Sequence, residues 1–134
     1  MSGELNNSAT EEQLQALSLK IFGEPASKAN SRKIARIGGI SRLIKSKKAL
    51  TYSEAFKAQC TPLSPLMSGD VRVTMKIYYA SRRPDLDESL ILDLLQGVAY
   101  ENDRQVKEKH IYWGLDKENP RCEIRVEPIS VDKK

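Results

Sequence analysis

The nine residues Val71–Tyr79 constrain the fold of this 134-residue chain more than any other segment. Apolar side chains occupy every second position, which predicts a strand with one buried face and one solvent-facing face. Such a strand needs neighbours in a sheet and a second layer over its apolar face. Because the chain is long enough for one hydrophobic core, we expect a single mixed α/β domain over residues 14–134, behind a disordered polar tail over residues 1–13.

Other segments predict the partners of this strand. Alternating apolar residues predict further strands over 17–22, 105–113 and 121–127. The last two are expected to pair as an antiparallel hairpin. Apolar residues at helical spacing predict helices over 51–59 and 87–96. The expected fold is therefore a mixed α+β arrangement, with a sheet of about four to five strands backed by two main helices.

Two adjacent glycines, Gly38 and Gly39, separate basic runs at residues 32–37 and 40–44. Both glycines accept positive φ angles, so the pair predicts a tight turn in a basic hairpin arm. The surrounding segment 25–50 has eight basic residues and no acid, although the net charge of the whole chain is only +4. This distribution is typical of a surface that binds a polyanion, and it also fits an ordinary solvated face.

The segment 85–103 has the opposite character, with six acids and no base. After a proline the chain is biased towards an extended form, in which Asp85 and Asp87 project to the same side. Two converging carboxylates repel each other unless a divalent cation or a shared proton neutralises them, and in an otherwise basic protein the pair suggests a site for Mg²⁺ or Mn²⁺. A short return loop would bring Asp103 to the same site, and Glu88 is a candidate acid just outside the ligand set. An isolated Asp-x-Asp more often caps a helix, and that alternative stays open.

Several classes of protein are excluded or disfavoured. No apolar run approaches the roughly 20 residues of a membrane-spanning helix. The first residues contain acids where an export signal has basic ones, so we expect a cytoplasmic protein. Cys60 and Cys122 lack metal-binding spacing and are expected to be reduced thiols. The single histidine, His110, is expected to be an ordinary strand residue.

Several motifs together resemble a known family. They are Arg82–Asp87, the helix ending at Leu94–Tyr100, Asn102–Val106, the earlier turn Gly23–Arg32 and the closing run Pro120–Val126. In this order they resemble the RusA family of Holliday-junction resolvases over roughly residues 17–127. The resemblance implies a small, homodimeric, Mg²⁺-dependent endonuclease of a kind common in prophages. It also implies that the acidic triad of the family falls on Asp85, Asp87 and Asp103.

The chain departs from the family pattern in two places. Glu88 stands where the family usually has asparagine, and Ile91 stands at the spacing where a lysine is expected. Lys45, Lys76 and Arg83 are candidates to replace that lysine. The helical segment before Asp103 is also about two residues shorter than is common in the family.

The function implied by the resemblance is resolution of four-way DNA junctions by paired, symmetric phosphodiester hydrolysis, in recombination and repair, in a bacterial or phage-encoded cytoplasmic protein. The cations expected to contact DNA are Lys28, Arg32, Lys33, Arg36, Arg42, Lys45, Lys47, Lys48, Arg82 and Arg83. Candidates for the dimer surface are the hairpin arm and the aromatic residues Tyr52, Tyr112 and Trp113. Two alternatives remain: a non-catalytic basic DNA-binding protein, and a metal-dependent nuclease that prefers flaps or single strands.

Overall fold

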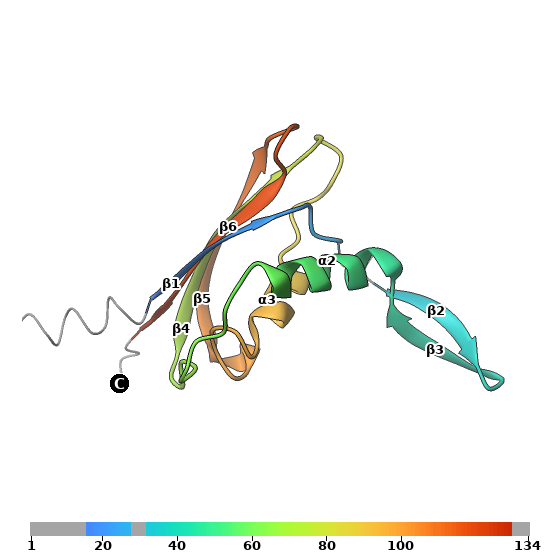
Figure 1. Ribbon diagram of the computed structural model, residues 1–134, viewed down its shortest axis with the longest axis horizontal. Coiled ribbons are helices and arrows are strands. Elements are labelled where there is room, and N and C mark those ends of the chain that lie inside the picture. Colours follow the sequence, from blue (N-terminus) through green and yellow to red (C-terminus); the bar gives the residue numbers. More distant parts are fainter. Residues whose placement is uncertain (1–15, 28–31, 130–134) are drawn as a thin grey trace, which may run out of the picture.

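The computed structural model describes residues 16–27 and 32–129, except the side chains of residues 32, 33, 35, 42 and 43. The expected tail over residues 1–13 and the cation Lys28 lie outside the described residues. The described chain is a mixed α+β fold, as the sequence predicts, with a four-stranded sheet, a separate two-stranded sheet and two main helices (Figure 1). No helix in this part of the chain has the length and apolar character needed to cross a membrane.

Four strands form the main sheet in the order β1-β6-β4-β5. They are β1 (Leu17–Phe22), β4 (Val71–Tyr79), β5 (Val106–Leu115) and β6 (Arg121–Pro128). Strand β4 is central because its alternate side chains, from Val71 to Tyr79, are all buried. It pairs antiparallel with β6 and parallel with β5.

The predicted hairpin of the last two strands is wrong. Strands β5 and β6 run in opposite directions, but β4 lies between them. The connecting turn crosses the end of β4, where the Asp116 N–H donates to the Tyr79 carbonyl over 2.9 Å. Burial explains why β4 and not β5 lies next to β6. Strand β5 has charged and exposed positions, which suit the edge of a sheet, whereas β4 is buried at alternate positions and pairs with a strand on each side.

Both helices pack on the same face of the sheet (Figure 1). Helix α2 (Lys47–Ala58) contributes buried Ala49, Tyr52 and Phe56. It begins four residues before the predicted start, because Ser46 is the N-cap and its side chain accepts a hydrogen bond from the Ala49 N–H. Burial of Tyr52 removes it from the candidate dimer-surface residues.

Helix α3 (Ser89–Leu95) connects β4 to the parallel strand β5. Its buried residues are Leu90, Ile91, Leu94 and Leu95, which is the predicted apolar face. Gly97 follows the helix with a φ of +86°, as expected for a left-handed residue at a helix end. The β4–α3–β5 unit places two parallel strands with their carboxyl ends side by side, and such edges are common ligand-binding positions in α/β folds.

Strands β2 (Arg32–Ile37) and β3 (Ile40–Lys45) form the predicted hairpin, joined by Gly38 and Gly39. They pair with each other and with no strand of the main sheet. The hairpin extends from the start of α2 away from the body of the protein (Figure 1). We call residues 32–45 the arm.

The two cysteines are free thiols in the described structure, as expected. Cys122 is fully buried in β6, and burial raises the pKa of its thiol to about 12. Cys60 is partly buried at the end of α2, and burial raises its thiol pKa as well. Both thiols are therefore protonated at neutral pH and unsuited to act as nucleophiles.

Candidate active site

The loop from residue 80 to residue 88 leaves the carboxyl end of β4 and carries Asp85 and Asp87. Tyr79, the last residue of β4, is only 2% exposed and holds this loop through its hydroxyl group. The hydroxyl donates to the Asp85 carbonyl and accepts from the Asp87 N–H, both over 3.2 Å. Burial raises the pKa of Tyr79, so the hydroxyl keeps the proton that it donates.

Trp113 on β5 holds the loop from the neighbouring strand. Its indole Nε1–H donates to the Pro84 carbonyl over 3.1 Å. Its ring stacks on Tyr79 with centroids 5.8 Å apart. Because β4 and β5 are parallel, both aromatic residues lie near the carboxyl edge of the sheet, and together they attach the loop backbone at residues 84, 85 and 87.

Asp85 and Asp87 line one open cavity of about 860 Å³. Asp85 is exposed and Asp87 is partly buried, so both carboxylates are in a position to meet a solvated ligand. The side chain of Asp87 also accepts a hydrogen bond from the Ser89 N–H over 2.9 Å. Asp87 therefore bonds to the first residue of α3 and lines the cavity as well, whereas the N-cap position itself is Glu88, whose side chain makes no cap hydrogen bond.

Glu24 lines the same cavity and was not found by sequence reasoning. Its Oε1 atom accepts from the Ala80 N–H over 2.9 Å, which ties the turn after β1 to the start of the acidic loop. The available signal was the Gly-Glu-Pro turn at the end of β1, where Gly23 has a φ of +112°. Only the sheet order reveals that this turn lies beside β4, since β1 and β4 are both neighbours of β6.

Asp103 lies at a different cavity, of about 240 Å³, which Lys109 and Glu108 also line. It begins the short 3-10 helix η1 (Asp103–Gln105), directly before β5 starts at Val106. The Pro84 carbonyl is held at Trp113, seven residues further along that strand, whereas Glu88 is ion-paired with Lys109, three residues along it. Within residues 16–27 and 32–129, no three Asp, Glu, His or Cys side chains are close enough to share one metal ion. The structure therefore does not bring the three predicted ligands together.

An ion pair lies between the two cavities. Lys109 Nζ on β5 is 2.6 Å from Glu88 Oε2, and Glu88 directly follows Asp87. Lys109 also lines the cavity of Asp103. Glu88 was predicted as an acid outside the ligand set. It neutralises Lys109, which lies between the cavity of Asp85 and Asp87 and the cavity of Asp103.

The predicted DNA-binding cations divide into three groups. Lys48 and Arg83 line the cavity with Asp85 and Asp87. Arg36, Lys45, Lys47 and Arg82 are exposed elsewhere. The backbones of Arg32, Lys33 and Arg42 belong to the arm, but their side chains lie outside the described atoms.

Among the candidates to replace the missing lysine, only Arg83 lines the cavity. Lys45 is in the arm, and Lys76 lies over the ring of Tyr78 on β4. Ile91 is completely buried in the core, which explains why an apolar residue is favoured at that position.

The residues at the cavity fit a magnesium ion by their chemistry. Mg²⁺ prefers oxygen ligands and is commonly bound by one or two carboxylates, with waters and substrate phosphate oxygens completing the octahedron. Asp85 and Asp87 supply such a pair at one cavity. A complete cage of protein ligands is not required for this metal.

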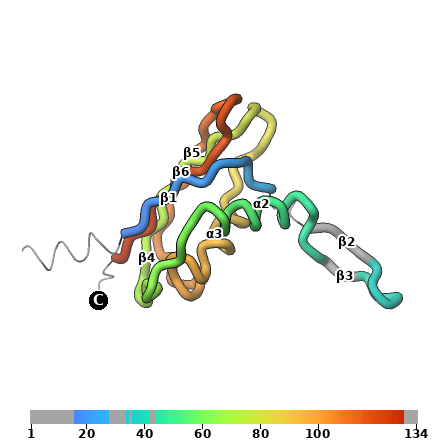
Figure 2. Tube along the Cα trace, viewed as in Figure 1, coloured from blue at the N-terminus to red at the C-terminus, as the bar shows by residue number. Residues whose placement is uncertain are grey.

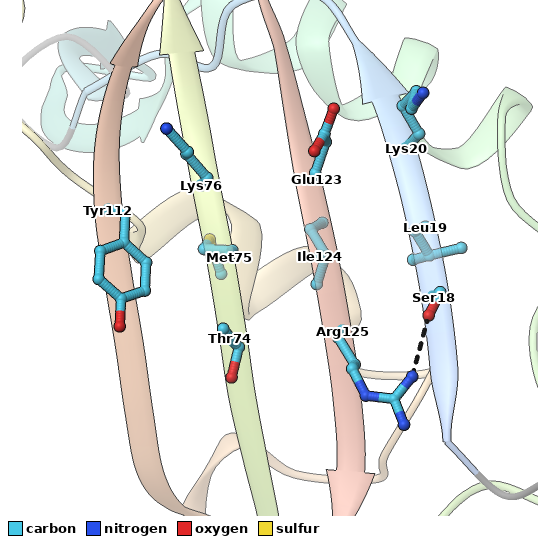
Figure 3. Close-up of a pocket in the computed structure, with 10 residues that line it drawn as sticks. All are labelled: Ser18, Leu19, Lys20, Thr74, Met75, Lys76, Tyr112, Glu123, Ile124 and Arg125. Carbon is cyan, nitrogen blue, oxygen red and sulfur yellow. Dashed lines mark hydrogen bonds between the residues drawn. The ribbon is translucent and has the colours of Figure 1, made fainter. Parts of the chain in front are cut away.

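A second large hollow, of about 430 Å³, lies on the sheet face opposite the helices (Figure 3). Its charged residues are Lys20, Lys76, Arg125 and a single acid, Glu123. Within this hollow no two carboxylates converge. We therefore place the candidate active site at the carboxyl edge of β4 and β5 and not on this open face.

Comparison with known proteins gives one family match. The sequence model described as Endodeoxyribonuclease RusA matches residues 23–127. The matched segment begins at the turn that carries Glu24 and includes the acidic loop and Asp103. No curated protein matches the chain.

Proposed function

The chain belongs to the RusA family of endodeoxyribonucleases, and on that premise we propose that it resolves Holliday junctions by Mg²⁺-dependent hydrolysis of paired phosphodiester bonds. One observation carries the proposal beyond the family. Asp85 and Asp87 line a single open cavity and are held there by a loop that two strand-end aromatic residues anchor.

In the proposed mechanism, Asp85 and Asp87 would hold the metal ion at this cavity. When bound there, the ion would supply Lewis-acid chemistry for polarising the scissile phosphate and activating water. Lys48 and Arg83, which line the same cavity, orient the phosphate by contacts to its free oxygens. Tyr79 and Trp113 touch no substrate and act as positioning residues for the loop.

We propose Asp103 as a third acid of the site, as the family resemblance implies. In the described structure Asp103 and Asp87 flank the Glu88–Lys109 ion pair. Binding of DNA and metal would therefore have to move the segment around Asp103 towards the loop, or use Asp103 at a separate position along the DNA. A substitution that separates these roles is described in the Discussion.

We also propose that the protein acts in the cytoplasm as a homodimer with two metal sites. A two-fold axis would present the sites symmetrically, which suits nicking of the two like strands of a junction. The basic arm would bind phosphates without reading the base sequence. Recombination and repair are the processes that need this reaction.

Cleavage of a labelled four-way junction tests the proposal, with linear duplex and flap DNA as comparison substrates and Mg²⁺, Mn²⁺ or EDTA in the buffer. We expect symmetric nicks that require metal. Asp87→Asn should abolish the nicks while junction binding is retained. Asp93→Asn is the matched control, because Asp93 is an exposed residue of α3 that lines neither acidic cavity.

Other outcomes would favour the two alternatives. Junction binding without cleavage in any divalent metal would support a non-catalytic DNA-binding protein. Faster cleavage of flaps or single strands than of junctions would support a nuclease with a different substrate shape. If Asp87→Asn and Asp93→Asn lose cleavage equally, the effect of Asp87→Asn is not specific to the cavity, and the proposed role of Asp87 as a metal ligand is contradicted.

A further inference from the structure

The arm exposes large apolar side chains that the core does not use. Ile34, Ile37 and Ile40 have exposed fractions of 74%, 52% and 60%. The arm pairs only with itself, so no other described strand or helix covers these residues. Exposed apolar groups that gather on one element mark a surface for contact with another molecule.

Two of these isoleucines form the tip of the arm. Ile37 and Ile40 are direct cross-strand partners on either side of the glycine turn. Side chains of such partners lie on the same face of a hairpin. Gly38 and Gly39 have φ angles of +62° and +80°, and beyond the adjacent residues of the chain no heavy atom lies within 4 Å of where a Cβ would stand on either glycine. The tip is therefore a thin backbone turn with an apolar pair directly behind it, at the end of an element that projects from the body (Figure 2).

The charge around the tip indicates what it contacts. The segment 25–50 contains eight cations and no acid, and Arg36 beside the tip is exposed. Contact between the arms of two copies would bring two equally basic segments together, and like charges in contact are unfavourable. A polyanion with apolar faces meets both requirements, because cations bind its phosphates while isoleucines contact its bases.

We propose that Ile37 and Ile40 form a wedge that inserts between bases at the open centre of branched DNA. Apolar side chains that enter base steps must unstack them, and unstacking costs least where base pairing is already interrupted. The wedge would therefore favour a junction over continuous duplex, whereas the arm cations would bind both. This proposal rests on the proposed function, because it assumes that branched DNA is the substrate.

The test uses the full chain and a four-way junction with 2-aminopurine next to the branch point, in EDTA so that no strand is cut. Fluorescence of 2-aminopurine rises when it unstacks. The wild-type protein should raise the fluorescence and bind the junction more tightly than linear duplex. The variant with Ile37→Ser and Ile40→Ser should lose the rise, and its affinity for the junction should fall about tenfold, since burial of apolar side chains is lost. Its affinity for linear duplex should stay within about twofold of wild type.

Ile34→Ser is the matched control, because it removes a more exposed isoleucine from the same arm and leaves the tip intact. It should behave as wild type in the fluorescence assay. The wedge is overturned if the tip variant still raises the fluorescence, or if it loses junction and duplex affinity equally. A change from dimer to monomer in the tip variant, measured by sedimentation, would assign the tip to a contact between copies instead.

Failure of the wedge and failure of the proposed function give different results. A wild-type protein that cuts the junction with Mg²⁺ but leaves 2-aminopurine stacked would disprove the wedge alone. A protein that neither binds nor cuts the junction would disprove the proposed function.

Discussion

The acidic loop and the arm are both excursions from the sheet, but they are attached in opposite ways. The loop at residues 80–88 is held by Tyr79 and Trp113, which are stacked side chains near the ends of two paired strands of the main sheet. The arm makes its strand pairing internally and exposes three isoleucines to solvent. The loop is therefore anchored to the main sheet along its length, whereas the arm forms a separate sheet of its own.

This difference matches the roles that we propose for the two regions. Carboxylates that hold a metal must be placed within a fraction of an ångström, which requires support from rigid elements. Phosphate contacts tolerate variation, because charge attraction acts over several ångströms. The comparison therefore supports the proposal that the loop carries the chemistry and the arm captures DNA, and the following substitutions test that division.

The largest effect is expected at the acids. Asp103→Asn should reduce junction cleavage about 100-fold or more if Asp103 joins the metal site, since ligand loss removes charge stabilisation of several kcal/mol. Glu24→Gln should change cleavage by less than about threefold, because an amide oxygen can still accept from the Ala80 N–H. Single-turnover cleavage measures both. Severe loss in Glu24→Gln with normal activity in Asp103→Asn would identify Glu24 as the third acid.

A smaller effect is expected from loosening the loop. Tyr79→Phe removes the hydroxyl that bonds Asp85 and Asp87, and should raise the Mg²⁺ concentration for half-maximal cleavage about three- to tenfold. Trp113, the only tryptophan, lies against this loop, so quenching of its fluorescence by Mn²⁺ measures metal binding without reference to activity. Tyr112→Phe is the control, since Tyr112 is exposed on the opposite face of the sheet. An unchanged metal requirement in Tyr79→Phe would show that the anchorage is merely structural.

The arm cations should affect binding and not chemistry. If about six phosphates are contacted, log K should fall against log salt with a slope near −5. Arg36→Ala and Lys45→Ala should each make that slope shallower by about 0.9 and weaken junction and duplex binding alike. Lys117→Ala, in the exposed turn between β5 and β6, should leave the slope unchanged. A loss of single-turnover cleavage at saturating protein would contradict the assignment of these residues to capture.

The smallest effect is expected on global stability. Gly39→Ala strains a residue with a φ of +80°, but the strain is confined to the arm, so the thermal midpoint should move by less than about 1 °C. Gly114→Ala should lower the midpoint by about 2 to 8 °C, because its new Cβ would lie 2.8 Å from the Tyr78 ring in the main sheet. Calorimetry distinguishes the two. Equal shifts would mean that the arm and the core unfold as one unit.

Local features were predicted well from the sequence, and long-range ones were not. The bounds of β4, the apolar face of α3 and the glycine turn of the arm follow from periodicity and from residue chemistry over a few positions. The pairing of β5 with β4 was not predicted. A short connection between β5 and β6 suggests a hairpin, and the local sequence does not indicate that β4 lies between these two strands. The start of α2 was missed because Ser46 lies in a basic run that was assigned to the arm.

The same division holds for the candidate site. The sequence by itself determined that Asp85 and Asp87 share a side and that the cations and acids are segregated, since both are properties of neighbouring residues. The tertiary structure alone decided that Glu24, Lys48 and Tyr79 meet that pair and that Asp103 lies at another cavity. The physical reason is the order of the strands, because burial of β4 in the centre of the sheet determines which distant segments lie beside its carboxyl end.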